Sequence, residues 1–256
     1  MNQLPVRWLC EAFEAGEFSP ALRPPPRQGR DFCGPLPVAC FAIPEGEGAE
    51  TEAETEAETE GGMEYLSDYE QQILAGLRFE KRRREWLMGR WTAKKLLSAL
   101  LGCAPGELSI EPEAGGAPVI WRAGERLPGC LTISHRGERA LAAWTDAKGL
   151  RIGADLEKAG ESNPTWMADY LTDTEWELRN GQGSHWPYLV WSAKEAVLKA
   201  LRTGLRVDTR EIEVFPGEGA LDGWRQLDVR SRLVEGDLWV GWRQEGVYLL
   251  TLAIIE

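Results

Sequence analysis

The sequence has only two histidines and no run of 18 apolar residues. The scarcity of histidine argues against a zinc site, and the lack of a long apolar run excludes a membrane-spanning helix. The first residues, MNQLPVRWLCEAFEAG, have no apolar core of a signal peptide, so we expect a cytoplasmic protein with no membrane partner. The five cysteines are odd in number and no pair has metal-ligand spacing, which favours reduced thiols.

Basic residues are fewer than acidic ones, 29 against 41, so the net charge is −12. Eight of the negative charges come from the glutamates of EGEGAETEAETEAETE at 45–60, a tract with no apolar face. We expect a mobile acidic loop at 45–62. The opposite bias follows at 78–95, where eight basic residues accompany two acidic ones. This basic segment indicates either an anionic ligand or an ordinary solvated helix face.

Two stretches about 100 residues apart resemble each other. The first is WTAKKLLSAL at 91–100, and the second is WSAKEAVLKAL at 191–201. Each predicts a helix, and each is followed by a strand pattern, ELSIEP or EIEVFP, and then by a hairpin pattern. One position changes its charge, because Lys95 in the first stretch corresponds to Glu195 in the second.

The repeated order of elements indicates a duplication within the chain. It predicts an α+β fold of two pseudo-twofold-related halves, each a helix packed on a small antiparallel sheet. We expect an irregular N-terminal extension at 1–35, a first half at 36–145 that contains the acidic loop, and a second half at 146–256. The cleft between such halves is a natural ligand site.

The segment RIGADLEK at 151–158 alternates apolar and other residues with a period of two, which predicts a strand. Asp155 and Glu157 would then share one face, where two carboxylates repel unless a cation lies between them. Mg²⁺ suits such oxygen ligands and often completes its shell with substrate phosphates. The alternative is the solvent-facing edge of a strand, which is the commoner origin of an isolated Asp-x-Glu.

The second helix favours the metal site, because Glu195 would add a third carboxylate. Lys199 lies four residues later on the same helical face, where it could hold a phosphate oxygen or a hydroxyl. The alternative is an ordinary surface ion pair between the two, worth only about 0.3–0.5 kcal/mol. Ser134 and His135 end a predicted hairpin strand near where the halves meet, although a lone histidine is usually structural. A cleft with one divalent metal and several cations suits phosphoryl-group chemistry on a large polyanionic substrate.

Four motifs, in this order, carry a resemblance to a known family. They are KRRREWLMGR at 81–90, ISH at 133–135, GADLE at 153–157 and WSAKEAVLK at 191–199. Together they resemble the 4′-phosphopantetheinyl transferases of the surfactin-synthetase-activating type, over roughly Leu66 to Phe215. The resemblance implies that family's duplicated fold in a single chain, with coenzyme A bound between the halves, and we expect a monomer.

The resemblance also implies a reaction. The enzyme would move the phosphopantetheine arm of coenzyme A to a serine of an acyl or peptidyl carrier protein and release adenosine 3′,5′-bisphosphate. Asp155, Glu157 and Glu195 would bind Mg²⁺ in the second half. Glu195, or a metal-bound water, would take the serine proton, and Lys199 would steady the pyrophosphate and the attacking hydroxyl.

The same resemblance implies that four residues of the first half bind the 3′-phosphate of the nucleotide: Arg82, Arg90, Ser134 and His135. Many members have a lysine in a G-K-P segment upstream, where this chain has Ala117. Arg84 or Arg122 could compensate for that missing cation. Many members also continue Ser-His-Ser, where this chain has Arg136.

Two other functions use some of the same residues. Paired acids, a lysine and a basic run would also suit a metal-dependent nuclease or a nucleic-acid-binding protein. The negative net charge and the lack of interleaved aromatic and basic residues argue against a nucleic-acid partner. The other alternative is a non-catalytic relative that binds carrier proteins, but such a protein has no reason to retain the full set of acids and the lysine.

Overall fold

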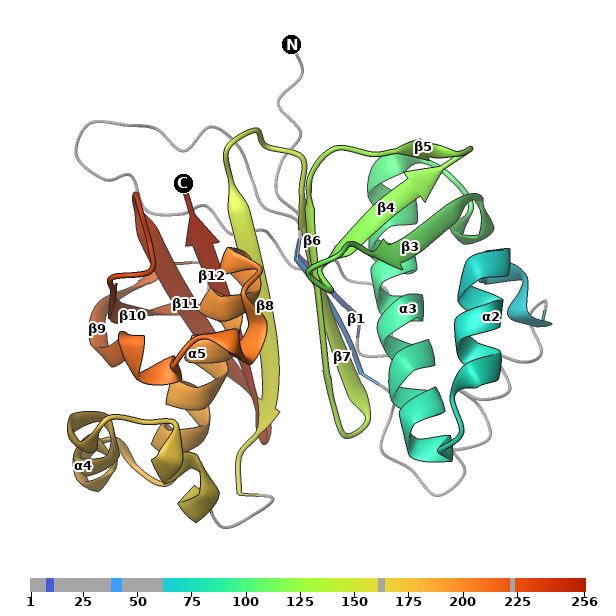
Figure 1. The fold of residues 1–256 in the computed structure, drawn as a ribbon. Helices are drawn as coiled ribbons and strands as arrows, with labels where there is room; N and C mark the ends of the chain where they lie inside the picture. Colours follow the sequence, from blue (N-terminus) through green and yellow to red (C-terminus); the bar gives the residue numbers. More distant parts are fainter. Residues whose placement is uncertain (1–7, 12–37, 43–61, 161–163, 222–223) are drawn as a thin grey trace.

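The computed structural model of the protein describes residues 8–11, 38–42, 62–160, 164–221 and 224–256 (Figure 1). Within these ranges the chain is a mixed α+β protein whose helices pack on antiparallel sheets. The acidic tract at 45–60 lies outside the described residues, as does most of the N-terminal extension. No helix in the described ranges combines the length and the apolarity that a membrane crossing requires.

The first sheet has the strand order β1-β2-β7-β6. Its strands are β1 (Trp8–Glu11), β2 (Val38–Ala42), β7 (Arg139–Thr145) and β6 (Cys130–Arg136). Strands β2, β7 and β6 are antiparallel, as predicted, and the predicted hairpin of β6 and β7 is confirmed. Strand β1 pairs with β2 in the parallel direction, so the N-terminal segment is not wholly irregular, contrary to our expectation.

Helix α3 (Glu80–Leu101) packs on the first sheet, and the shorter α2 (Asp68–Gly76) lies beside it (Figure 1). The apolar side chains of α3 that face the sheet, among them Leu96 and Leu97, are fully buried. A small antiparallel sheet follows along the chain: β3 (Leu108–Pro112), β4 (Pro118–Arg122) and β5 (Glu125–Arg126). Two short 3₁₀ helices precede α2 and β3: Gly62–Tyr65 and Pro105–Glu107.

The second sheet is antiparallel throughout, with the strand order β8-β12-β11-β10-β9. Its strands are β8 (Arg151–Lys158), β9 (Ile212–Leu221), β10 (Trp224–Ser231), β11 (Leu238–Glu245) and β12 (Tyr248–Ile255). The predicted strand at 151–158 and the predicted hairpin of β11 and β12 are confirmed. The apolar residues of β8, Ile152, Ala154 and Leu156, enter one core cluster, so Gly153 and Asp155 face the other way.

Helix α5 (Trp186–Leu201) covers that other face of β8 (Figure 1). It is apolar around most of its circumference because it is almost wholly buried, and α4 (Asp173–Gln182) packs against it. Gly153 permits the close approach, since a Cβ atom there would lie 1.9 Å from the carbonyl oxygen of Ala196. Short 3₁₀ helices complete this region: Pro164–Asp169, Gly204–Arg206 and Thr209–Glu211.

The two sheets meet where β6, the edge of the first, lies beside β8, the edge of the second (Figure 1). Side-chain hydroxyls of β6 bridge the two edges. The Thr132 hydroxyl accepts a hydrogen bond from the backbone N–H of Ala154 at 3.0 Å, and the Ser134 hydroxyl accepts one from Leu156 at 3.3 Å. The junction therefore satisfies backbone groups of an edge strand that would otherwise lack partners.

Candidate functional site

Asp155 is the centre of the β6–β8 junction. The residue is only 5% exposed, and its Oδ1 accepts hydrogen bonds from the Ser134 hydroxyl at 2.7 Å and the Lys199 ammonium at 2.6 Å. Burial opposes ionisation, but Lys199 and the hydroxyls of Ser134 and Ser192 hold the pKa of Asp155 below its ordinary value. The second oxygen, Oδ2, is buried and has no hydrogen-bond partner among the described residues. A buried, charged carboxylate thus has one oxygen left to bind another group.

Lys199 comes to this carboxylate from α5. Its Nζ also lies 3.0 Å from the Ser134 hydroxyl and 3.2 Å from the carbonyl oxygen of Ala154. Three acceptors match the three N–H bonds of an ammonium. The structure therefore brings together Ser134, Asp155 and Lys199, one residue from each of three elements.

Glu157 points to the same side of β8 as Asp155 and is 7% exposed. Its Oε2 lies 3.2 Å from Nε of Arg136. Burial, together with the negative charge of Asp155, raises the pKa of Glu157 to about 7 despite that pairing. Arg136, which replaces a serine common in the resembled family, is the cation nearest this carboxylate.

Glu195 lies on α5, half-buried and four residues before Lys199. Burial and the negative charge of Asp155 raise its pKa, whereas Lys199 opposes that rise. In the part of the chain that the structure describes, no three His, Cys, Asp or Glu side chains gather as metal ligands. The carboxylates of Asp155 and Glu157 instead turn to two different cations, Lys199 and Arg136.

Ser134 and His135, both predicted to hold the 3′-phosphate, lie on opposite faces of β6, and their shared role stays a prediction. Ser134 points to Asp155, whereas His135 points to α3, where it would lie 3.9 Å from a Cβ atom at Gly89. Burial lowers the pKa of His135, and the positive charges of Arg82 and Lys199 lower it further. Arg82, which is exposed on the first turn of α3, is therefore close enough to His135 to act on it.

Arg90 of α3 pairs with Glu70 of the neighbouring helix α2. Its Nε lies 3.5 Å from Oε1 of Glu70, and its guanidinium lies 4.8 Å from the ring centre of Trp86. Arg90 is therefore engaged by Glu70 and Trp86 in the structure. Its contact with a nucleotide phosphate stays a prediction.

The segment around Ala117 is approached by two arginines that the sequence did not single out. Arg202, at the end of α5, donates to Oε1 of Glu113, and Arg206 donates to the carbonyl oxygen of Gly115 at 2.9 Å. Arg122, one of the predicted substitutes for the missing lysine, instead binds Glu107 at 2.9 Å on the surface. The cations next to this loop thus come from the segment that follows α5 and, through Arg126 on Glu113 at 3.2 Å, from β5.

Two cavities of about 380 Å³ lie away from Asp155. One is lined by Ser67, Ser109 and Trp121 near the start of α2. The other is lined by His185, Arg225 and Trp242 near the start of α5. Neither of these two cavities is lined by Asp155, Glu157, Glu195 or Lys199.

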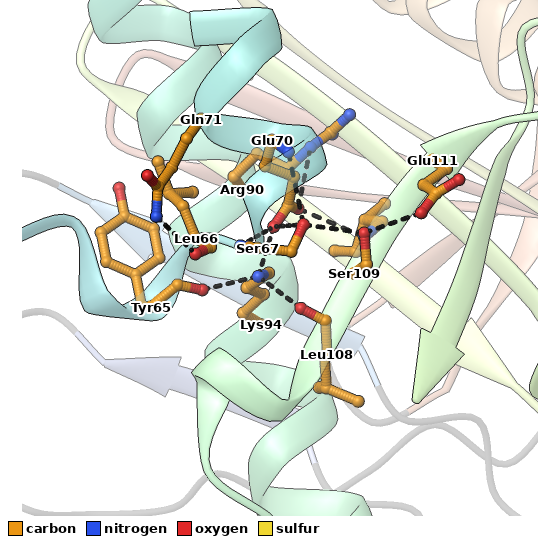
Figure 2. Close-up of polar contacts among 11 residues, drawn as sticks. Tyr65, Leu66, Ser67, Glu70, Gln71, Arg90, Lys94, Leu108, Ser109 and Glu111 are labelled. Carbon is orange, nitrogen blue, oxygen red and sulfur yellow. Dashed lines mark hydrogen bonds and ion pairs between the residues drawn. The ribbon is translucent and has the colours of Figure 1, made fainter. Parts of the chain in front are cut away.

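The sequence patterns did not predict two buried ion pairs: Lys94 with Glu70, shown in Figure 2, and Lys194 with Glu175. All four side chains are fully buried. A second repeat in the sequence could have revealed them, since YLSDYE at 65–70 recurs as YLTDTE at 170–175. Each copy contains the Ser/Thr-x-x-Glu pattern of a capping box at the start of a helix.

Comparison with known proteins agrees with the second-half motifs. Residues 151–230 match the 4′-phosphopantetheinyl transferase superfamily. The L-aminoadipate-semialdehyde dehydrogenase-phosphopantetheinyl transferase of Schizosaccharomyces pombe is 31% identical over 166 residues, which are 58% of this chain and 64% of the relative. The 4′-phosphopantetheinyl transferase HetI of Nostoc sp. is 29% identical over 152 residues, 56% of this chain and 62% of the relative.

A third relative, the L-aminoadipate-semialdehyde dehydrogenase-phosphopantetheinyl transferase of Pongo abelii, is 25% identical over 158 residues, 56% of this chain and 50% of the relative. The chain therefore spans less than two thirds of the length of each of these relatives.

Proposed function

We propose that this protein transfers the 4′-phosphopantetheine group of coenzyme A to a serine of an acyl or peptidyl carrier protein. The observation that carries the proposal is the Asp155–Lys199 pair at the β6–β8 junction, with Glu195 beside it. These residues lie within the stretch that matches the 4′-phosphopantetheinyl transferase superfamily. On the resemblance of the four motifs, we further propose that the chain is of the surfactin-synthetase-activating type.

We propose that acidic residues of the junction hold a magnesium ion, although three of them do not converge as a ligand set in the described residues. Asp155 offers a buried oxygen without a hydrogen-bond partner, and carboxylate oxygens are the ligands that Mg²⁺ prefers. Burial raises the pKa of Glu157, and the negative charge of Asp155 raises it further, both of which a bound cation would oppose. We assign Asp155, Glu157 and Glu195 as the residues that hold the ion. When bound, Mg²⁺ would neutralise charge on the pyrophosphate of coenzyme A.

The protein's own residues would carry the transfer as follows. The serine oxygen of the carrier forms a bond to the phosphorus that bears the pantetheine arm. The bond from that phosphorus to the bridging oxygen breaks, and the electron pair leaves with adenosine 3′,5′-bisphosphate. Glu195 accepts the serine proton, a role that its raised pKa favours. Lys199 donates to the oxygens on which negative charge accumulates.

The same proposal assigns the two ends of coenzyme A to two halves of one chain. The first half, at 36–145, would contact the nucleotide through Arg82 and His135, which are close enough for the charge of Arg82 to lower the pKa of His135. The second half, at 146–256, would hold the pyrophosphate. We propose that these halves are related by a pseudo-twofold axis, because the two buried Lys–Glu pairs occur at matching places in each. The protein would act as a monomer.

The test uses purified protein, coenzyme A, Mg²⁺ and an apo-carrier protein, with the carrier serine replaced by alanine as the control. We expect the intact mass of the carrier to increase by one phosphopantetheine group and adenosine 3′,5′-bisphosphate to appear in equal amount. Neither product should form with the alanine carrier. Cleavage of coenzyme A without modification of the carrier would reject transfer and indicate a hydrolase. A metal-dependent cut in DNA or RNA would favour the nuclease alternative.

A further inference from the structure

The buried ammonium of Lys94 is fully bonded within the first half. As Figure 2 shows, it donates to the carbonyl oxygens of Tyr65 at 2.6 Å and Leu108 at 2.7 Å, and to Oε2 of Glu70. The other oxygen of Glu70 accepts the backbone N–H of Ile110 at 3.2 Å. One pair thus joins α3 to the start of α2 and to β3.

Lys194 makes the same set of bonds in the second half. Its ammonium donates to the carbonyl oxygens of Tyr170 and Thr209, each at 3.1 Å, and to Oε2 of Glu175 at 2.8 Å. The other oxygen of Glu175 accepts the backbone N–H of Val214 at 2.7 Å. This pair joins α5 to the start of α4 and to β9.

Aromatic contacts extend the correspondence. Tyr65 meets Trp91 edge to face at 5.0 Å, and Tyr170 meets Trp191 in the same way at 4.9 Å. The helix residue that follows the buried lysine is what differs. In the first half it is Lys95, which lies over the ring of Trp91, and in the second half it is Glu195.

The position of Lys194 therefore fixes the rotation of α5. Successive helical residues are about 100° apart around the axis, so a lysine bonded on one side determines where its neighbours point. Glu195 and Lys199, four residues apart, share the side that faces Asp155. A small rotation of the helix would move both relative to β8.

We propose that Lys194 and Glu175 are positioning residues that set α5 in the rotation needed by Glu195 and Lys199. This proposal rests on the proposed transfer reaction, because the change in kcat is measured on that reaction. Lys94 and Glu70 do the same for α3 but have no catalytic residue beside them. The first pair is therefore a control in which the buried lysine has corresponding bonds and the same burial but a different neighbour, while its glutamate also pairs with Arg90.

The test compares Lys194→Met with Lys94→Met, because methionine keeps an unbranched side chain without the charge. Lys194→Met leaves Glu175 without the cation it is paired with and should lose about 10 °C of Tm. Lys94→Met leaves Glu70 with Arg90 at 3.5 Å, so its loss of Tm should be no larger. Only Lys194→Met should lower kcat, by about 100-fold for a displacement near 1 Å. Its KM for coenzyme A should rise by a smaller factor than kcat falls, because the proposed nucleotide contacts belong to the first half and only the pyrophosphate contact belongs to α5.

A second readout does not depend on activity. Amide hydrogen exchange across 191–199 should accelerate in Lys194→Met and remain near the wild-type rate in Lys94→Met. Equal losses of kcat in the two variants, or unchanged exchange in α5, would overturn the proposal. If the wild-type protein transfers nothing, the proposed function fails, while the exchange comparison still decides whether Lys194 holds the helix.

A double variant covers the case in which Lys194→Met does not fold. Lys194→Met with Glu175→Gln removes both buried charges, which relieves the uncompensated carboxylate. We expect it to fold, with the same fall in kcat and faster exchange in α5. A double variant that fails to fold, or that folds with wild-type kcat and wild-type exchange, would reject the positioning role.

Discussion

The replacement Gly153→Ala tests whether the close contact of β8 with α5 builds the site. A Cβ atom at Gly153 would lie 1.9 Å from the carbonyl oxygen of Ala196 and 2.5 Å from the backbone nitrogen of Ala200. Real Cβ atoms essentially never approach another heavy atom within 3.0 Å. Both neighbours are backbone atoms, so the helix as a whole must withdraw by roughly 1 Å, a displacement that can cost about 100-fold in rate.

The stability change follows from the same distances. Overpacking a filled core costs about 1–3 kcal/mol, and the backbone nitrogen and oxygen here leave no flexible side chain to yield. Replacing glycine by alanine in a strand otherwise gains about 0.5–1 kcal/mol. We therefore expect a net loss of about 2 kcal/mol in the free energy of unfolding, measured by urea denaturation, and at least a 100-fold loss of kcat/KM.

Gly181→Ala in α4 is the matched control. No atom would lie within 4 Å of its Cβ, and its backbone is helical. Alanine should therefore stabilise the protein by about 0.5–1 kcal/mol and leave transfer unchanged. Transfer at the wild-type rate by Gly153→Ala would refute the claim that the close packing of α5 on β8 positions the residues of the site.

Three further predictions concern charge. Glu195→Gln should lower kcat by about 10²–10³-fold with an unchanged Tm; turnover within a few-fold of wild type would remove Glu195 from the reaction. His135→Ala should weaken coenzyme A more than dephospho-coenzyme A in calorimetric titrations, and equal losses would mean that His135 does not contact the 3′-phosphate. Deletion of the acidic tract at 45–60 should leave Tm unchanged and raise kcat/KM for an acidic carrier at low salt, with a smaller gain at high salt. A lower kcat/KM after that deletion would show that the tract aids docking.

Local patterns in the sequence predicted much of the second sheet. The period of two at 151–158 places Asp155 on the face of β8 that meets α5, and this follows from strand geometry alone. The repeated helices and hairpins were equally visible, because their apolar spacing depends on residues close in sequence. Lys199 was expected near the acids, and it lies 2.6 Å from Asp155.

Partners chosen by tertiary packing were harder to foresee. Adjacent residues of a strand point to opposite faces, yet Ser134 and His135 were assigned one ligand because the motif places them together. Buried lysines are rare, so Lys94 and Lys194 were not expected inside the core. Their partners lie about 20 residues upstream in the chain, where only the recurrence of YLSDYE as YLTDTE hints at the pairing.

The most direct test of the central claim is the intact mass of an apo-carrier protein incubated with this protein, coenzyme A and Mg²⁺. Wild type and Asp155→Asn should be compared in parallel, each with and without Mg²⁺. The account predicts a carrier heavier by one phosphopantetheine group with wild type and Mg²⁺, and an unmodified carrier in the other three reactions over the same time. An unmodified carrier with wild type and Mg²⁺, across acyl and peptidyl carriers, or equal modification by Asp155→Asn, would contradict it.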